Sequence, residues 1–494
     1  MKSRILAGAL VSTYLLTTGC SSSGGDEQPT TDINDLDKIR QVLSTNADLA
    51  YAAYADTVTT TEQLKTAIDA LVANPTGTTL ANAKKAWLVA REPYEQTEVF
   101  RFRNGPIDDD KTTTATEDGP EGSINAWPLG EALIDYVKEG TDFGADQVGV
   151  SSNSVGVSDP IPTNNIIETT GITIDAAMLD NNATASDERD VISGYHALEF
   201  LLWGQDLNAG DDADTLNMRE AASSYPLDSG GHRPVTDFYD DTNGHDGACT
   251  SGADHSSAAN DICTRRNTYL AVAAQKLIDD LTSVRDAWAP AAGYRTSFTT
   301  VTSLAEGKSR LLKILTGMGT LSEGELAGER IQIALSSGSQ EEEHSCFSDN
   351  THRDILLAAE GVYNSYHGTY PGYDSTLDGT ANAATRAVSG YGIDDYLREI
   401  GETALADDVA AALASTRTNT LGVDAKARAG MPFDVLIENP TGTDAKPVRD
   451  TILSLTAQSV QIARVATELD LGSASDVVDP DATACNTSDP TSSC

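Results

Sequence analysis

Apolar residues recur at helical spacing over most of this 494-residue chain, and this pattern constrains the fold more than any other feature. In the segment 265–288, for example, Leu270, Leu277, Leu281 and Val284 fall on one face of a helix. The alternation of apolar and polar residues that a half-buried strand requires is almost absent. The sequence therefore predicts an all-α protein.

The expected helices form two groups, separated by an irregular acidic insert over residues 208–261. We expect helices over 36–54, 62–72, 80–102, 129–137, 187–203, 265–288, 302–318, 322–335, 351–366, 394–416 and 450–469. A chain of this length exceeds one ordinary core. We therefore expect two helical-bundle domains, 35–207 and 262–471, packed with a cleft between them and followed by a polar tail over 472–494.

The amino terminus has the pattern of an export signal over residues 1–19. Lys2 and Arg4 precede an apolar stretch that is too short to span a membrane, and no other segment is suited to span one. Cys20, followed by a Ser/Gly-rich tether over 20–34, resembles a bacterial lipoprotein processing site. We expect lipidation at Cys20 and a place in the cell envelope, on the periplasmic or surface side and at the outer membrane, with simple secretion as the alternative.

Charge and cysteine content limit the partners and the compartment. The 75 acidic and 33 basic residues give a formal net charge of −42, which excludes nucleic acid as a partner because phosphates require clustered Lys and Arg. Two cysteine pairs, Cys249–Cys263 and Cys485–Cys494, suit disulfides in an oxidising compartment. Cys346 is left as a buried thiol.

One apolar segment, 194–204, contains a histidine and a glutamate three residues apart, His196 and Glu199. On a helix this spacing places both side chains on one face, directed into or beside the core. Imidazole and carboxylate are a half-site for a transition metal. The alternative is a buried hydrogen bond that only orders the core, because metal sites of this kind need ligands from other helices.

Two further segments combine polar groups in an unusual way. The expected helix 80–102 aligns Trp87, Arg91, Tyr94, Glu98 and Arg101 on one stripe, unless this stripe is a solvated surface. The loop after it contains Gly105 and Pro106, which would hold Asp108 in one place.

The segment 341–352 has metal-ligand types within a few residues of each other. They are His344, Ser345, Asp349 and His352, together with three glutamates, Glu341 to Glu343. Helix capping by Ser348, Asp349 or Asn350 accounts for part of this composition. The His-Glu-x-x-His helix of metalloproteases, phosphate-binding loops and nucleophile turns are absent from the sequence.

Together these motifs resemble the imelysin-like proteins, in particular the iron-regulated protein A branch of envelope lipoproteins. The resemblance covers about residues 35–470 and rests on the Gly-x-His-x-x-Glu signature at 194–199, the stretches 87–108 and 125–129, the segment 344–352 and Pro432-Phe433-Asp434. It implies a signature at a cleft between two helical domains, and a link to iron acquisition. It also implies a metal site of His196, Glu199 and Glu98, with Arg91, Tyr94, Arg101, Asp108, His344, Ser345, Asp349 and His352 as lining candidates.

The leading hypothesis is an envelope module that binds a metal ion, iron before zinc, or a small iron-containing ligand for uptake. A metallopeptidase is the first alternative, although two ligands and no spare general base are too few for a catalytic zinc. A structural lipoprotein without a metal is the second alternative.

Overall fold

The structure is a computed structural model that describes residues 36–109, 119–137, 165–169, 171–180, 191–206, 230–245, 249, 259–478 and 483–494. Over these ranges helices are the main secondary structure and strands are almost absent, which confirms the all-α prediction. The expected signal peptide 1–19, the tether with Cys20 and most of the insert 208–261 lie outside the described residues.

The helices differ widely in length. The long ones are α1 (Leu36–Ala73), α2 (Gly77–Glu95), α8 (Ala259–Ala287), α10 (Leu304–Thr320), α12 (Thr351–His367), α14 (Thr403–Arg428) and α16 (Lys446–Glu468). The short ones are α3 (Glu121–Ile124), α4 (Glu131–Ile134), α6 (Ala176–Leu179), α7 (Gly194–Trp203), α9 (Gly293–Thr299), α11 (Ile333–Ser337), α13 (Ile393–Glu399) and α15 (Phe433–Ile437).

The remaining elements are irregular helices and one small hairpin. A π-helix, η3 (Leu321–Gln332), joins α10 to α11, and 3-10 turns form η1 (Glu98–Phe100), η2 (Val235–Phe238), η4 (Gln340–Glu342) and η5 (Ala474–Asp476). The strands β1 (Thr369–Tyr370) and β2 (Val388–Ser389) pair antiparallel.

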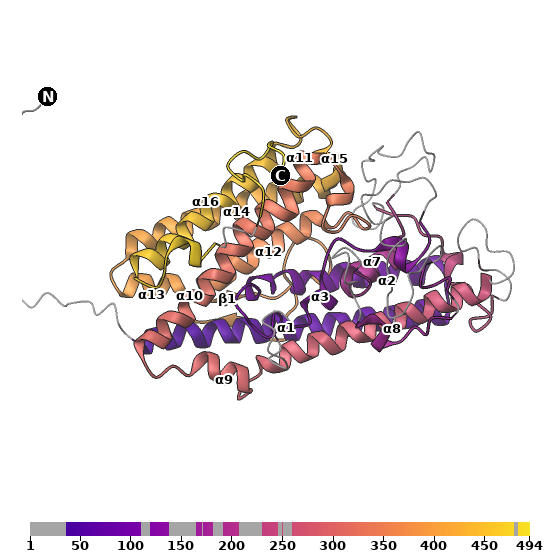
Figure 1. Ribbon diagram of the computed structural model, residues 1–494, viewed down its shortest axis with the longest axis horizontal. Coiled ribbons are helices and arrows are strands. Elements are labelled where there is room, and N and C mark those ends of the chain that lie inside the picture. The colour runs from indigo at the N-terminus through magenta and orange to yellow at the C-terminus, as the bar shows by residue number, and fades with distance from the viewer. Residues whose placement is uncertain are drawn as a thin grey trace, which may run out of the picture.

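Helices α1 and α8 run side by side along the long axis of the molecule, with α2 against α1 (Figure 1). Helix α7 packs on both α2 and α8, while α14 packs against α16 and α12. The larger hydrophobic core includes residues of α1, α2, α7 and α8, and a smaller one lies among η3, α12, α15 and α16. Helices from both sides of the insert therefore share one core, and the expected division into domains and the cleft between them stay predictions.

Among the predicted helices whose bounds are wrong are the first three along the chain. The helices expected over 36–54 and 62–72 are one helix, α1, and its central threonines bond to carbonyls of the preceding turn: Thr57 to Ala53 at 2.9 Å and Thr61 to Thr57 at 2.8 Å. The helix expected over 80–102 ends at Glu95, where the Thr97 hydroxyl donates to the Tyr94 carbonyl at 2.6 Å. Side chains after Glu95 therefore leave the helical stripe.

The covalent cross-links have the pairing that the sequence predicts. Cys249 is bonded to Cys263 and Cys485 to Cys494, while Cys346 is a free thiol. Among the described helices, none is long and apolar enough to cross a membrane.

Candidate functional site

Helix α7, which carries His196 and Glu199, begins at a glycine that no other residue can replace without strain. Gly194 has a φ of +87°, and a Cβ atom on it would lie 2.4 Å from the Ile124 carbonyl oxygen of α3. All ten residues of α7 are buried. This glycine lets α7 approach α3 closely, which fixes the directions of the two polar side chains.

His196 and Glu199 form a buried dyad. The His196 Nδ1 atom lies 2.9 Å from Glu199 Oε2, and Glu199 Oε1 accepts hydrogen bonds from the Ser348 backbone N–H at 2.9 Å and hydroxyl at 2.6 Å. The other ring nitrogen, His196 Nε2, is buried and has no hydrogen-bond partner among the described residues. The pair thus forms the buried hydrogen bond that the sequence offers as an alternative to a metal site, but one ring nitrogen of His196 has no hydrogen-bond partner in the described part of the chain.

A second dyad of the same kind lies against the first. His344 Nδ1 is 2.8 Å from Asp354 Oδ2, which also accepts the Ser345 hydroxyl at 2.5 Å. The ring of His344 packs edge-on against the ring of His196, with centroids 4.7 Å apart and an interplanar angle of 79°. The sequence places these two histidines far apart, and the fold joins them.

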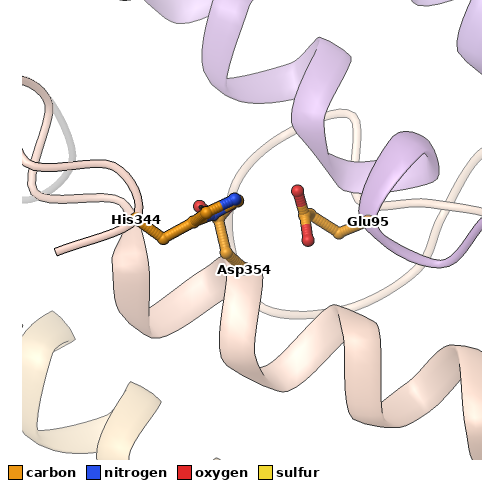
Figure 2. A group of neighbouring side chains, drawn as sticks. All are labelled: Glu95, His344 and Asp354. Atoms are coloured by element: carbon orange, nitrogen blue, oxygen red, sulfur yellow. Dashed lines mark hydrogen bonds and ion pairs between the residues drawn. The ribbon is translucent and has the colours of Figure 1, made fainter. Parts of the chain in front are cut away.

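Arg91 neutralises the carboxylates around the second dyad. Its guanidinium is completely buried, forms ion pairs with Glu95 and with Asp354 at 3.2 Å, and donates to Asn125 Oδ1 at 2.5 Å. Figure 2 shows Glu95 of α2 facing the His344–Asp354 pair. One potential ligand atom from each of these three residues lies within 4.8 Å of the other two.

A second buried arginine enters from the π-helix η3. Arg330 contacts Glu95 at 3.3 Å, Glu98 at 2.5 Å and Glu325, of the same π-helix, at 2.8 Å. Glu325 and Arg330 are five residues apart, a separation that does not share one face of an α-helix. Stretches of π-helix are rare and frequent at functional sites, and here the π-helix directs both charged groups to one place.

The charged network around the dyads contains more acidic than basic groups, of which Glu121 and Glu325 are 22% and 21% exposed. Six carboxyl groups lie among three guanidinium groups: Glu95, Glu98, Glu121, Glu199, Glu325 and Asp354 against Arg91, Arg101 and Arg330. Six minus three leaves an excess of three negative charges if all ionise. An excess of buried negative charge is unfavourable unless protons or a cation compensate it.

The pKa values respond to this excess in different directions. Burial raises the pKa of Glu199 to about 8, and the hydrogen bonds from Ser348 only partly oppose it. Burial alone would also raise the pKa of Glu98, but Arg101 and Arg330 outweigh it and hold that pKa at about 2. Glu98 is therefore a permanent carboxylate that the arginines neutralise.

Both histidines of the dyads are neutral in the folded protein. Burial and the neighbouring His344 lower the pKa of His196 well below its usual value. Burial and Arg330 lower the pKa of His344 to about 4. Neutral imidazole is the form that binds a metal ion.

The predicted stripe of α2 faces α7, so the alternative of a solvated surface is wrong. The Trp87 indole N–H donates to the Tyr195 carbonyl at 2.9 Å, and the ring of Tyr94 packs against the ring of Tyr195 at 4.8 Å. Arg101, just past η1, pairs with Glu98 at 2.9 Å and with Glu121 at 3.1 Å. Within the stripe, Arg91 contacts the second dyad directly through Asp354, while Trp87 and Tyr94 pack beside α7.

Other predicted residues have different surroundings. Asp108 accepts backbone N–H groups of Phe102, Arg103 and Gly105, so it holds its own loop as expected. His352 lies 3.0 Å from the Asp349 carbonyl and 3.6 Å from Asp424. Asp349 lies near two other aspartates, as described below.

The expected helix cap at α12 is also different from the prediction. Asn350 occupies the N-cap position, but its side chain makes no cap hydrogen bond and instead donates to Asp354 Oδ1 at 3.2 Å. Ser348, another expected cap, binds Glu199. Polar residues that resemble a cap in the sequence therefore serve the two dyads.

Sequence reasoning missed three of the central charged groups, Glu95, Asp354 and Arg330. The sequence contains a signal for Glu95, because Glu95 lies four residues after Arg91 on the same helix, a spacing that lets the two side chains pair. Asp354 follows Thr351 in the first turn of α12, where an acidic residue is ordinary. Arg330 had no signal, because it reaches the site only through the π-helix.

Comparison with known proteins supports a single family. The family model for imelysin matches residues 50–462. The crystal structure of an iron-regulated protein A precursor from Parabacteroides distasonis superimposes with a TM-score of 0.55 at 15% identity, covering 88% of this chain and 96% of that one.

An imelysin-like protein from Psychrobacter arcticum has a TM-score of 0.50 at 15% identity, covering 89% of this chain and 98% of that one. A search of curated proteins gives no match. At this identity the two structures support the fold alone, while the family model spans most of the sequence. The chain belongs to the imelysin family.

Proposed function

We propose that this protein binds a metal ion at the paired His196 and His344 dyads and takes part in iron uptake at the cell envelope. Iron is the expected metal, alone or within a small ligand, and zinc is the second choice. The name of the structural neighbour from Parabacteroides distasonis, an iron-regulated protein A precursor, favours iron. The two dyads supply the donor atoms.

The observation that carries this proposal is the buried His196 Nε2 atom without a hydrogen-bond partner among the described residues. A histidine that binds a metal usually has its other ring nitrogen bonded to a carboxylate, which fixes the ring and its tautomer. His196 has this arrangement through Glu199, and His344 has it through Asp354. In this proposal Glu199 orients His196, while Glu95 and Asp354 are further candidate ligands.

The charge of the network supports a cation in preference to a neutral ligand. Burial raises the pKa values of Glu95, Glu121 and Glu199, so protons compensate the excess of carboxyl groups in the metal-free protein, and a divalent ion can replace such protons on binding. Protonated Glu199 donates to His196 Nδ1 and keeps the ring proton on Nε2, whereas ionised Glu199 accepts from Nδ1 and leaves a lone pair on Nε2. We therefore expect binding to release a proton from Glu199.

Metal analysis of matched variants tests the proposal. Protein purified without a His tag is stripped with a chelator, reloaded with Fe(II) under anaerobic conditions and assayed for bound iron by elemental analysis. We expect stoichiometric iron in the wild type and none in the double variant His196→Ala, Glu199→Ala. Equal iron in both proteins contradicts the proposal.

The matched control is His367→Ala. His367 Nδ1 lies 2.8 Å from Asp394 Oδ2, so it forms a histidine–carboxylate pair like that of the site but at the end of α12. We expect this variant to keep its iron. A loss of iron in the control means that the assay reports unfolding rather than ligand removal.

The peptidase alternative predicts a different result in the same proteins. A metallopeptidase cleaves a protein substrate in a chelator-sensitive manner and loses this activity in Glu199→Gln. Cleavage that survives the substitution indicates a contaminating protease. Iron binding without cleavage favours the uptake proposal.

We further propose that the chain is anchored to the membrane through a lipid on Cys20. The apolar stretch before Cys20 and the Ser/Gly-rich tether after it support this proposal. Metabolic labelling with a fatty acid tests it in cells: label is expected in the wild type and not in Cys20→Ser. Label that persists in the variant contradicts it.

A further inference from the structure

A second group of potential metal ligands lies outside the two dyads. Asp206 follows α7, Asp349 is in the loop before α12, and Asp434 is in α15. One carboxylate oxygen from each lies within 4.8 Å of the other two. Three distant segments of the chain thus bring three acidic side chains together at this point.

Asp349 is the central member of this group. Its side chain is 5% exposed, and its Oδ1 atom is buried without a hydrogen-bond partner among the described residues. Burial together with Asp434 and Asp206 raises the pKa of Asp349 well above its usual value, against the hydrogen bond from the Gly230 backbone. The protein therefore holds this carboxyl group where ionisation is unfavourable.

Several other buried carboxylates of this protein have arginine partners. Asp135 pairs with Arg233 at 2.8 Å and with Arg266 at 2.6 Å, and Glu92 pairs with Arg353 at 2.8 Å. No lysine or arginine among the described residues forms an ion pair with Asp349. Asp349 therefore differs from Asp135 and Glu92, because its charge has no basic partner in the part of the chain that the structure describes.

We propose that Asp206, Asp349 and Asp434 bind one hard divalent cation of the calcium type. Carboxylate oxygens are the ligands of such ions, at bond lengths of about 2.3–2.6 Å, so two oxygens on one ion lie at most about 5 Å apart. The 4.8 Å grouping satisfies this limit. Without nitrogen or sulfur donors, the group favours calcium or magnesium over iron or zinc.

This cation ties together the segments that support the dyads. The loop containing Asp349 also carries His344 and Ser348, and its Phe347 carbonyl accepts from the Gly231 N–H at 2.8 Å. Asp206 connects the loop to the end of α7, which carries His196. The ion is therefore structural, and it is separate from the iron of the proposed function.

Calorimetric titration and thermal unfolding with Ca²⁺ test the site. Full-length protein stripped of metal is titrated with CaCl₂, and in parallel with MgCl₂, beside Asp349→Asn and the exposed control Asp407→Asn. We expect wild type and Asp407→Asn to bind Ca²⁺ and to melt at a higher temperature with it. Asp349→Asn is expected to bind at least about tenfold more weakly, because affinity at such sites follows the number of charged ligands.

The melting temperatures of the metal-free proteins are a second readout, and here Asp349→Asn is expected to be the more stable protein. Removal of a charge that faces two other carboxylates relieves repulsion, so metal-free Asp349→Asn is expected to melt above the metal-free wild type. A merely structural hydrogen-bonding role predicts the reverse order. Should Asp349→Asn fail to fold, the partly exposed Asp206→Asn gives the same comparison of Ca²⁺ affinity.

The inference is overturned if the wild type binds neither Ca²⁺ nor Mg²⁺ at millimolar concentration, or if the wild type and Asp349→Asn bind equally well. His196→Ala separates this site from the proposed iron site. It is expected to keep the Ca²⁺ response even when iron binding is lost. Loss of the Ca²⁺ response in His196→Ala shows that the ion binds at the dyads and overturns the separate site.

Discussion

Replacement of Glu199 by glutamine separates the stability of the buried dyad from its ability to bind a metal. Burial raises the pKa of Glu199 to about 8, from an ordinary value of 4.5. Between these values the folded protein keeps the proton while the unfolded chain loses it, so rising pH favours unfolding. The destabilisation is absent below pH 4.5, grows as pH rises, and is complete above about pH 8. At pH 7 the pH lies about 2.5 units above the ordinary pKa, and at about 1.36 kcal/mol per unit the destabilisation is about 3 kcal/mol.

Glutamine has no proton to lose, and it can keep the hydrogen bonds to Ser348 and His196. We therefore expect metal-free Glu199→Gln to exceed the wild type in free energy of unfolding by up to about 3 kcal/mol at pH 7, and by close to zero near pH 4.5. Urea denaturation in the presence of a chelator at the two pH values measures this difference. Glu468→Gln on the exposed end of α16 is the control and is expected to change little at either pH.

The same substitution is expected to abolish metal binding. The glutamine amide donates to His196 Nδ1, which forces the ring proton onto Nε2 and removes its lone pair. A more stable protein that no longer binds iron is therefore the expected result. Glu199→Gln that is less stable than the wild type at pH 7, or that binds iron equally well, refutes this reasoning.

Three further predictions concern the surroundings of the site. Iron affinity is expected to rise by up to about tenfold per pH unit below pH 8 and to level off above it, because binding displaces the Glu199 proton. Iron titrations in buffers of different pH measure this slope, and an affinity that does not change with pH contradicts the prediction. Arg330→Met leaves buried carboxylates uncompensated and is expected to destabilise the protein by about 3–5 kcal/mol in urea denaturation. The control Arg464→Met, which removes an exposed ion pair, is expected to cost about 0–1 kcal/mol. Equal effects of the two variants contradict the role of Arg330 in neutralising the buried carboxylates. Gly194→Ala places a methyl group 2.4 Å from the Ile124 carbonyl oxygen at a φ of +87°. This variant is expected to lose about 1–3 kcal/mol of stability and to bind iron more weakly. The control is Gly422→Ala, whose methyl group lies in open space within α14.

Much of the fold and the core of the site could be predicted from local patterns. Helical periodicity predicted the all-α architecture, and the i, i+3 spacing predicted that His196 and Glu199 share a buried face. The stripe that includes Arg91 predicted a polar interior, which burial confirms. These signals are short-range, so they are visible without the tertiary structure.

The rest depends on contacts between distant segments. The sequence contains no sign that the His344 ring packs against His196, or that Ser348 binds Glu199 rather than capping α12. Arg330 reaches the network because residues 321–332 are π-helical, whereas the periodicity of an α-helix would place its side chain on a different face of the helix. The end of α2 at Glu95 also has no clear signal in the sequence, and the part of the stripe beyond it lies in η1 and the following loop.

The most direct test of the central claim is anomalous diffraction at the iron absorption edge from crystals of the iron-loaded protein. The account predicts an anomalous peak within bonding distance of His196 Nε2, adjacent to His344 and buried beside Glu95 and Asp354. A loaded crystal without a peak at His196, or with its iron at other residues, contradicts the account.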